Sequence, residues 1–204
     1  MIKNLPPNTV ERLSLYRRKL LNYTEEKQFI HSHKLAHLLQ INPAHIRRDL
    51  MLIGFSGDVH KGYDIENLII SIGDVIDSPK KRKVTFVGIG DLGRAVAEHF
   101  NNPNTKLEIA ATFRLTEEPK VQFPNVHCYN ISKMKAIIKK EKIELCVIAV
   151  PKEYAKEISK TVIESGVKGI LNFTSVHLTV PDSIYIEDYD MISKLEKLAY
   201  FTSE

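Results

Sequence analysis

A glycine-rich loop between an apolar strand and a helix constrains this chain more than any other feature of its sequence. The apolar stretch Lys83–Val87 is followed at once by G-x-G-x-x-G, with glycines at 88, 90 and 93, and then by a helical pattern. In this context the first glycine allows a tight turn, the second lets the backbone approach a pyrophosphate, and the third lets the helix pack on the strand. The helix N-terminus offers unpaired N–H groups to the phosphates. The loop predicts a dinucleotide site, and the alternative is a glycine turn that holds no ligand.

The next predicted strand ends in a residue that does not suit an ordinary NAD site. This strand, residues 107–113, ends at Phe113 and is followed by Arg114. An NAD site usually has an acidic residue about 20 positions after the glycine loop, where it binds the ribose hydroxyls. Arg114 could instead face a 2′-phosphate or point into water. NAD(H), NADP(H) and an empty site therefore all remain open from the sequence alone.

Short apolar runs alternate with helical patterns through the rest of the chain after the basic connection 78–83. Strands are expected at 84–87, 107–113, 126–129, 145–150, 169–173 and 184–187, and helices at 92–100, 132–141, 152–165 and about 190–201. Strands that alternate with helices predict a parallel sheet with helices on both faces.

The part before the connection is helical and carries turn signals of a different kind. Helices are expected at 10–23, from Ser32, at 44–53 and at 65–76, with Thr9, Ser32 and Asn42 as N-caps and Pro43 in the first turn of the third helix. The short turn 40–42 makes the second and third helices a helix-turn-helix. Three glycines (54, 57 and 62) then mark a hairpin-like stretch.

The net charge of +4 is confined to the first 60 residues. They hold nine Lys and Arg against five Asp and Glu, whereas the other 144 residues hold twenty of each. A small basic module joined to a neutral one indicates a polyanion partner for the first part. The alternative is chance, because an excess of four charges is small.

The third helix carries the residues suited to reading DNA. In a helix-turn-helix the second helix enters the major groove, and an Arg fork can bond guanine O6 and N7 together. Arg47 and Arg48 occupy such positions, and Lys34 could meet a phosphate. The alternative is that both arginines form a solvated helix face, with Asp49 pairing locally.

Several classes of protein are not supported. No run of 18 apolar residues predicts a membrane span, and no secretory signal peptide is expected. Two cysteines, Cys128 and Cys146, cannot build a four-Cys zinc site, so we expect no metal and reduced thiols in the cytoplasm. The histidines at 99, 127 and 177 are scattered, and no catalytic motif is present, so no catalytic residue is assigned.

The chain resembles the Rex family of redox-sensing transcriptional repressors over nearly its whole length. The markers are Leu15-Tyr16-Arg17, Ile46-Arg47-Arg48-Asp49-Leu50, Gly62-Tyr63, residues 88–95, Val150-Pro151, residues 169–173 and residues 198–201. The resemblance implies a winged-helix DNA-binding domain over 1–80, a Rossmann domain over 81–188 and a C-terminal helix over 189–204. It also implies a homodimer in which each C-terminal helix is swapped onto the partner subunit. Such proteins bind palindromic operator DNA when free or with NAD⁺, and NADH releases them.

The resemblance also carries residue roles over by position. Lys34, Ala44, His45, Arg47, Arg48, His60 and Lys61 would contact DNA, and Asp190 would take part in switching between subunits. Gly88, Ile89, Gly90, Asp91, Leu92, Gly93, Phe113, Arg114, Val150, Pro151 and Asn172 would surround the NAD(H), with the last three near the nicotinamide.

Three departures from the family pattern bear on this interpretation. The acidic residue of the family at the second strand end aligns with Phe113, its basic wing tip reads Gly57-Asp58-Val59-His60-Lys61, and a Tyr after the glycine loop is replaced by His99. The sequence predicts a dimeric repressor whose operator binding is set by NAD⁺ or NADH. The alternatives are a small NAD(P)-dependent oxidoreductase and a CoA-binding Rossmann protein.

Overall fold

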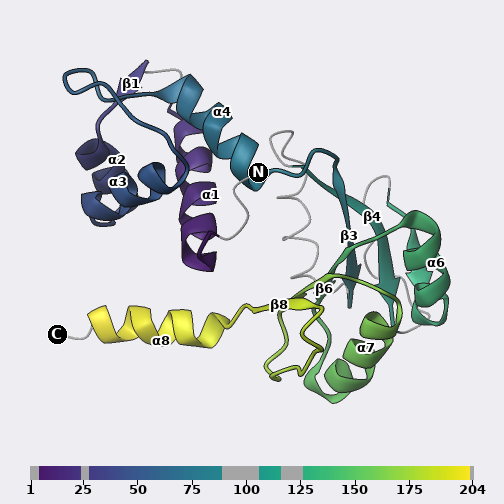
Figure 1. Cartoon of the computed structure of the whole chain (residues 1–204). Coiled ribbons are helices and arrows are strands. Elements are labelled where there is room, and N and C mark those ends of the chain that lie inside the picture. Colours follow the sequence, from purple (N-terminus) through teal and green to yellow (C-terminus); the bar gives the residue numbers. More distant parts are fainter. Residues whose placement is uncertain (1–4, 24–27, 89–105, 116–125, 203–204) are drawn as a thin grey trace. The chain divides into compact units, whose positions relative to one another are not determined.

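The chain is organised as two compact units joined at the basic connection. The computed structural model describes residues 5–23, 28–88, 106–115 and 126–202. It divides into Met1–Ser78 and Pro79–Glu204, a helical unit followed by a sheet unit (Figure 1). Each unit has a hydrophobic core of its own, so each is described by itself.

The first unit packs four described helices around one apolar core. The core takes one face of each helix, and Leu13, Leu35, Leu50 and Leu68 are all fully buried in it. A short antiparallel ribbon joins the helices, with Ile30 opposite Tyr63. The elements are α1 (Pro7–Leu21), β1 (Phe29–Ile30), α2 (Ser32–Leu39), α3 (Pro43–Leu52), β2 (Tyr63–Asp64) and α4 (Ile65–Ile76).

The predicted start of α3 is confirmed. The Asn42 side-chain oxygen accepts a hydrogen bond from the Ala44 N–H at 2.8 Å, and Pro43 is the first helical residue. Pro lacks an N–H that would be unpaired at this position, so both residues favour a helix that begins here.

Two other predicted caps are wrong. Helix α1 begins at Pro7, so Thr9 lies inside it and its hydroxyl donates to Asp49 at 3.2 Å. Ser32 is the first residue of α2, and the cap position belongs to His31, which makes no side-chain cap hydrogen bond. The Thr9 hydroxyl thus bonds a distant carboxylate, and the Ser32 hydroxyl lies one residue past the cap position.

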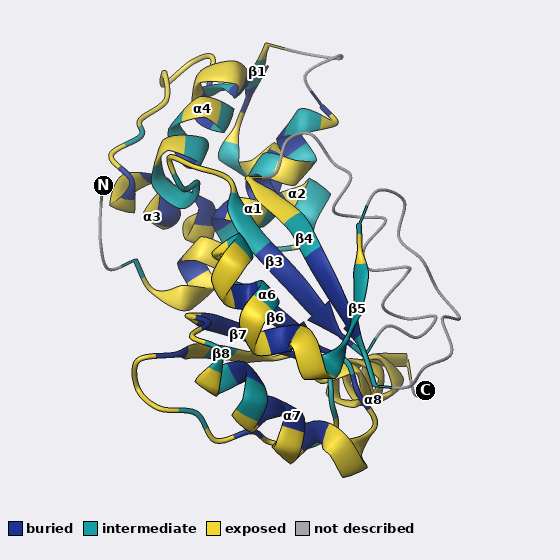
Figure 2. Cartoon of the chain, turned by 90° about the vertical axis from the view of Figure 1, so that its right-hand side faces the viewer, coloured by how far each residue is buried: buried dark blue, intermediate teal, exposed yellow. Residues whose placement is uncertain are grey.

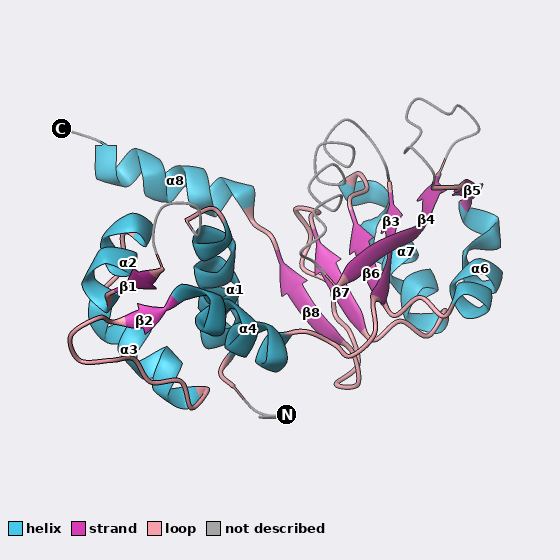
Figure 3. Cartoon of the chain, turned by 90° about the horizontal axis from the view of Figure 1, so that it is seen from above, coloured by secondary structure: helices cyan, strands magenta, loops and turns pink. Residues whose placement is uncertain are grey.

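The second unit is built on a six-stranded parallel sheet in the order β5-β4-β3-β6-β7-β8. This order confirms the predicted doubly wound architecture, and Figure 3 shows the strands among their helices. Strand order reverses at β3, between β4 and β6, and ligands bind in such folds at the carboxyl ends of the strands beside this reversal. The strands are β3 (Arg82–Val87), β4 (Leu107–Arg114), β5 (Cys128–Asn130), β6 (Leu145–Ile148), β7 (Gly169–Asn172) and β8 (Tyr185–Asp188).

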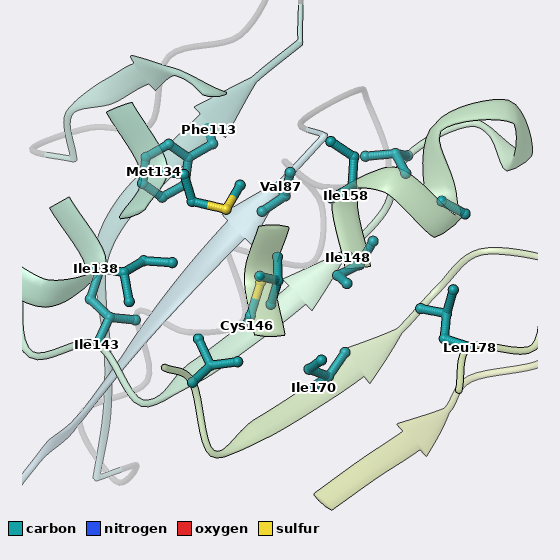
Figure 4. Close-up of a cluster of buried hydrophobic side chains, with 14 of the residues drawn as sticks. Val87, Phe113, Met134, Ile138, Ile143, Cys146, Ile148, Ile158, Ile170 and Leu178 are labelled. Carbon is teal, nitrogen blue, oxygen red and sulfur yellow. The ribbon is translucent and has the colours of Figure 1, made fainter. Parts of the chain in front are cut away.

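One face of the sheet is covered by α6 (Met134–Glu141), which follows the short 3-10 helix η2 (Ile131–Lys133), and by α7 (Lys152–Glu164). Met134, Ile138 and Ile158 from these helices pack against strand residues such as Val87 and Phe113 (Figure 4). Figure 2 shows the same pattern as buried stretches along β3 and β4.

The opposite face carries a smaller apolar cluster around Val84, Phe86 and Val147. Strand side chains alternate between faces, so β3 supplies residues to both clusters. The helix expected at 92–100 lies outside the described residues.

The last helix, α8 (Met191–Thr202), is exposed along its whole length (Figure 2). Six of its large apolar side chains are at least 48% exposed: Met191, Ile192, Leu195, Leu198, Tyr200 and Phe201. A face of this kind marks an interaction surface. None of the described helices has the length and apolar character of a membrane span.

Candidate functional site

The end of β3 approaches the end of β6 so closely that only glycine fits between them. Gly88 has a φ of +82°, and a Cβ there would lie 2.5 Å from the Ala149 carbonyl oxygen and 2.6 Å from Val150 Cγ1. The Gly88 N–H donates to the Phe113 carbonyl oxygen at 3.0 Å. Gly88 therefore has a backbone conformation that suits the predicted turn, and its contacts reach two neighbouring strands at the carboxyl edge of the sheet.

The remaining loop residues predicted to hold the pyrophosphate, Ile89, Gly90, Asp91, Leu92 and Gly93, lie outside the described residues, as does His99. The described part of the expected site includes Val150, which is buried beside Gly88, and Pro151, which is exposed just before α7. Their predicted place near the nicotinamide stays a prediction.

The two residues at the end of β4, Phe113 and Arg114, place their side chains in different environments. The Phe113 side chain is fully buried in the main core and packs against the Tyr129 ring, with centroids 6.1 Å apart. Only the backbone of Phe113 can therefore meet a ligand. Arg114 is half-buried and lines a cavity of about 540 Å³ with residues of β5 and η2.

Asn172, at the end of β7, is occupied by structural hydrogen bonds. Its amide donates to the Val176 carbonyl oxygen at 2.9 Å and to the Asp188 carboxylate at 2.8 Å. Its oxygen accepts from the Thr174 N–H and hydroxyl. Asn172 thus shapes the loop after β7, which lines a second cavity of about 560 Å³ beside the start of α8.

Asp190 caps the C-terminal helix. Its carboxylate accepts hydrogen bonds from the N–H groups of Ile192 at 2.9 Å and Ser193 at 3.1 Å, and from the Ser193 hydroxyl. These bonds, led by the Ser193 hydroxyl, lower the pKa of Asp190. Asp190 therefore fixes where α8 begins, and its role in switching stays a prediction.

The predicted DNA-reading residues gather on the exposed side of the helix-turn-helix. Ala44, His45, Arg47 and Arg48 of α3 are all exposed, whereas Ile46 between them is fully buried. Lys34, near the start of α2, is exposed as well. The turn between α2 and α3 contains Gln40 in the left-handed region, with a φ of 55°.

Asp49 does not pair locally with the arginines of its own helix. Its side chain is 1% exposed and accepts hydrogen bonds from Arg12 Nε and Nη2, both at 2.7 Å, and from the Tyr16 hydroxyl at 2.7 Å. Burial alone would raise its pKa, but the bonds from Arg12, Tyr16 and Thr9 outweigh burial and lower it. Arg47 and Arg48 are thus left without this carboxylate, and within the described ranges Arg47 donates to the Ser32 hydroxyl at 3.4 Å.

The segment after α3 forms a wing-like turn closed by a bridge between Asp58 and Gly62. The Asp58 carboxylate accepts the N–H groups of His60 at 2.7 Å and Lys61 at 2.8 Å, and these bonds lower its pKa. His60 and Lys61 are exposed, and the Lys61 ammonium lies 5.7 Å from the centre of the Phe29 ring. Asp58 is therefore the residue that shapes the turn tip, as well as a negative charge upon it.

Chemistry suited to catalysis is sparse in the described part of the chain. Cys146 is buried within β6, and desolvation raises the pKa of its thiol, which keeps it protonated. His177 pairs with Asp188 at 3.2 Å on an exposed surface. Across the described ranges, no group of three or more His, Cys, Asp and Glu side chains could hold a metal ion.

Two groups of residues were missed from the sequence. Arg12 and Thr9 hold Asp49 from another helix, and sequence spacing gives no sign of such a long-range pair. Ser132 and Lys133 share a cavity with Arg114. Strand order could have predicted this second group, because the third strand of a doubly wound fold lies beside the second and ends at the same edge.

Known protein families match both units. Residues 4–50 match a family described as "Putative DNA-binding protein N-terminus", and residues 79–176 match the family "CoA binding domain". The Redox-sensing transcriptional repressor Rex of Streptococcus uberis is 32% identical over 206 residues, covering 99% of this chain and 97% of that protein. The repressor of the same name from Streptococcus pneumoniae is 32% identical over 201 residues, covering 97% and 94%.

Solved structures show the same fold over nearly the whole chain. The crystal structure of RSP in complex with β-NAD⁺ and operator DNA has a TM-score of 0.83 at 23% identity and covers 98% of this chain and 93% of that chain. The crystal structure of RSP in complex with β-NADH has a TM-score of 0.82 at 23% identity and covers 97% and 93%.

Proposed function

This chain belongs to the Rex family of redox-sensing transcriptional repressors, and from that membership we propose that its first unit binds operator DNA while its second binds NAD⁺ or NADH. NADH binding lowers the affinity for the operator. The protein is a regulator and not an enzyme, and it acts in the cytoplasm, on double-stranded DNA with palindromic half-sites.

The observation that carries the DNA-binding half is the inward pairing of Asp49. This carboxylate is held by Arg12 and Tyr16, so the neighbouring Arg47 and Arg48 project from α3 without a local counter-charge. Both arginines are then free to contact base edges and phosphates in the major groove. His45 and Ala44 lie at the same end of the helix and complete the reading surface.

The nucleotide half rests on the β3 end and on the residues around it. Gly88 allows the close turn from which the backbone meets a pyrophosphate, and Val150 and Pro151 stand at the neighbouring strand end. A nucleotide can shift operator affinity only if it binds the DNA-competent and released states unequally. Asp190, the cap of α8, is the residue we place in the switch between them.

The exposed apolar face of α8 supports a homodimer. Six large apolar side chains on one short helix are at least 48% exposed, and an apolar surface of this kind is typical of an interaction site. We place this face against a second copy of the chain, which also matches the two-fold symmetry of a palindromic operator.

Fluorescence anisotropy with a labelled palindromic operator of the family tests this function. The wild-type chain should bind, NADH should weaken binding, and Arg47→Ala and Arg48→Ala should each weaken it by about tenfold, because one bidentate base contact contributes about 1–3 kcal/mol. Lys139→Ala, an equal loss of charge at an exposed position of α6, is the matched control and should bind like wild type. Binding that ignores both arginines would overturn the proposed reading helix. A complex that NADH leaves unchanged would overturn the sensing function.

A further inference from the structure

The cavity at the outer edge of the sheet is lined by basic and neutral polar groups. It lies where β4 and β5 end side by side, with Arg114 opposite Asn130 in the parallel register. Its volume is about 540 Å³, and its described lining is Arg114, His127, Cys128, Tyr129, Asn130, Ser132 and Lys133. None of these lining residues is acidic, so the cavity suits an anion.

Arg114 lines this cavity, and its guanidinium includes a hydrogen-bond donor without a partner among the described residues. Its Nε is buried, and it has no hydrogen-bond partner among the residues that the structure describes. Buried polar groups are nearly always paired, so an orphan donor of this kind indicates a missing ligand. The guanidinium is a rigid fork of N–H donors whose geometry matches the oxygens of a phosphate.

Lys133 supplies a second cation at the same cavity. It closes η2, is exposed, and has no salt bridge to a carboxylate within the described ranges. Ser132, beside it, offers a hydroxyl. Two cations of different kinds, one a planar fork and one a mobile point charge, can bind different oxygens of one phosphate.

The position of the cavity identifies which phosphate it would bind. In a doubly wound nucleotide fold, the end of the second strand meets the adenosine ribose, and an acidic residue there accepts bonds from its hydroxyls. At that position Phe113 turns its side chain into the core, and the next residue is the donor Arg114. Arginine and lysine have no acceptor for a hydroxyl proton, whereas a phosphate on the ribose accepts strong charge-assisted bonds from both.

We propose that this cavity is a subsite for the 2′-phosphate of the adenosine ribose, and that the chain therefore binds NADP(H) more tightly than NAD(H). The inference rests on the proposed function, because it assigns a nucleotide class to the same site. Arg114 is the specificity-determining residue, and Lys133 reinforces it.

Nicotinamide fluorescence measures both affinities directly, because the chain contains no Trp to interfere. NADPH should bind the full chain about tenfold more tightly than NADH, a difference equivalent to about 1.4 kcal/mol. Thermal shifts with 2′,5′-ADP, 3′,5′-ADP, 5′-AMP and CoA separate the sources of phosphate. The proposal expects stabilisation by 2′,5′-ADP above the others. A stronger effect of CoA or 3′,5′-ADP would overturn it in favour of a 3′-phosphate site.

Two variants and one control assign the subsite to its residues. Arg114→Gln and Lys133→Gln should each remove most of the preference for NADPH while leaving NADH affinity close to wild type. Lys133 is exposed, so its variant keeps the test valid even if Arg114→Gln folds poorly. Lys135→Gln, at an exposed position of α6 outside the cavity, should change neither affinity. NADH binding as tight as NADPH in wild type and both variants would overturn the subsite alone, whereas no binding of either would overturn the proposed nucleotide function.

Discussion

At the scale of single residues, the carboxyl edge of the sheet depends on a backbone conformation that only glycine adopts easily. Gly88 combines a positive φ with a neighbouring carbonyl oxygen and a valine methyl group where a Cβ would stand. The two effects are distinct, because one is local strain and the other is a clash between strands.

Gly88→Ala should therefore cost much more stability than the same change at Gly166, whose φ is +89° but which has nothing within 4 Å of its Cβ position. We expect a loss of about 1 kcal/mol for Gly166→Ala, from backbone strain alone. Gly88→Ala should lose about 2–5 kcal/mol, since overpacking is added to strain. Urea unfolding of the full chain gives both values, and equal losses would show that the close approach of β3 to β6 is not tight.

In the first unit, we expect stability to depend in the same way on one residue, Asp49, through its buried carboxylate. Asp49→Asn should destabilise this unit by about 2–4 kcal/mol, because Arg12 and Tyr16 keep their donors but lose the charge that they face. Asp77→Asn is the comparison variant: it removes the partner of Arg17 in a pair of the same 2.7 Å length whose carboxylate is more exposed, 22% against 1% for Asp49, so it should cost less than Asp49→Asn. Urea unfolding followed by circular dichroism measures both, and a wild-type midpoint for Asp49→Asn would contradict the inward pairing.

The pH dependence of this pair has a definite sign. The folded pKa of Asp49 lies below its ordinary value of 3.8, so its contribution is present above that value and is lost as the pH falls through the folded pKa. The unfolding curves of wild type and Asp49→Asn should therefore converge as the pH is lowered below 3.8. If the difference in free energy of unfolding between wild type and Asp49→Asn stays constant below pH 3.8, the contribution of Asp49 comes from the shape of its side chain and not from its charge.

At the scale of elements, the wing-like turn depends on a residue that sequence comparison marks as unfavourable for DNA. Asp58 carries a negative charge, but its oxygen accepts two backbone N–H groups that set the direction of His60 and Lys61. The negative charge of Asp58 thus repels a phosphate, whereas the hydrogen bonds that it accepts hold two basic residues, which attract one.

Substitutions at Asp58 should separate these effects. Asp58→Asn keeps an acceptor oxygen and removes the charge, so operator affinity should rise a few-fold and its salt dependence should steepen. Asp58→Ala removes the charge and the cap together, so it should gain less or lose affinity, because the turn is no longer held. Anisotropy titrations at two salt concentrations measure this, and identical behaviour of the two variants would show that the cap does not position the wing.

Most elements could be predicted from the sequence because their signals are local. The Asn42-Pro43 start of α3, the helix at 65–76 and the positive φ of Gly88 after β3 each follow from a few adjacent residues. Thr9 was predicted wrongly as a cap because the proline pair before it already starts the helix, and its hydroxyl meets a carboxylate 40 residues away. The cavity around Arg114 was missed for a related reason, since its lining comes from segments that only the sheet brings together.

At the scale of the whole molecule, assembly rests on the C-terminal helix. Leu198→Glu in α8 should produce a monomer, because a charge on the apolar face opposes its burial against a second copy. Lys197→Glu on the same helix should leave the dimer intact, since at about 100° per residue this position lies on the side of the helix away from Met191, Leu195 and Leu198. Light scattering coupled to size-exclusion chromatography gives the masses, and a dimeric Leu198→Glu variant would place the interface elsewhere.

Helix α1 is held by arginine–carboxylate pairs to two different elements of its unit. Arg12 bonds Asp49 on α3, and Arg17 bonds Asp77 at the end of α4, one residue before the unit ends. Helix α3 and the end of the unit are thus both bonded to α1. We therefore expect a rotation of the connecting segment 78–83 to move Arg47 and Arg48 together with α1 and α4.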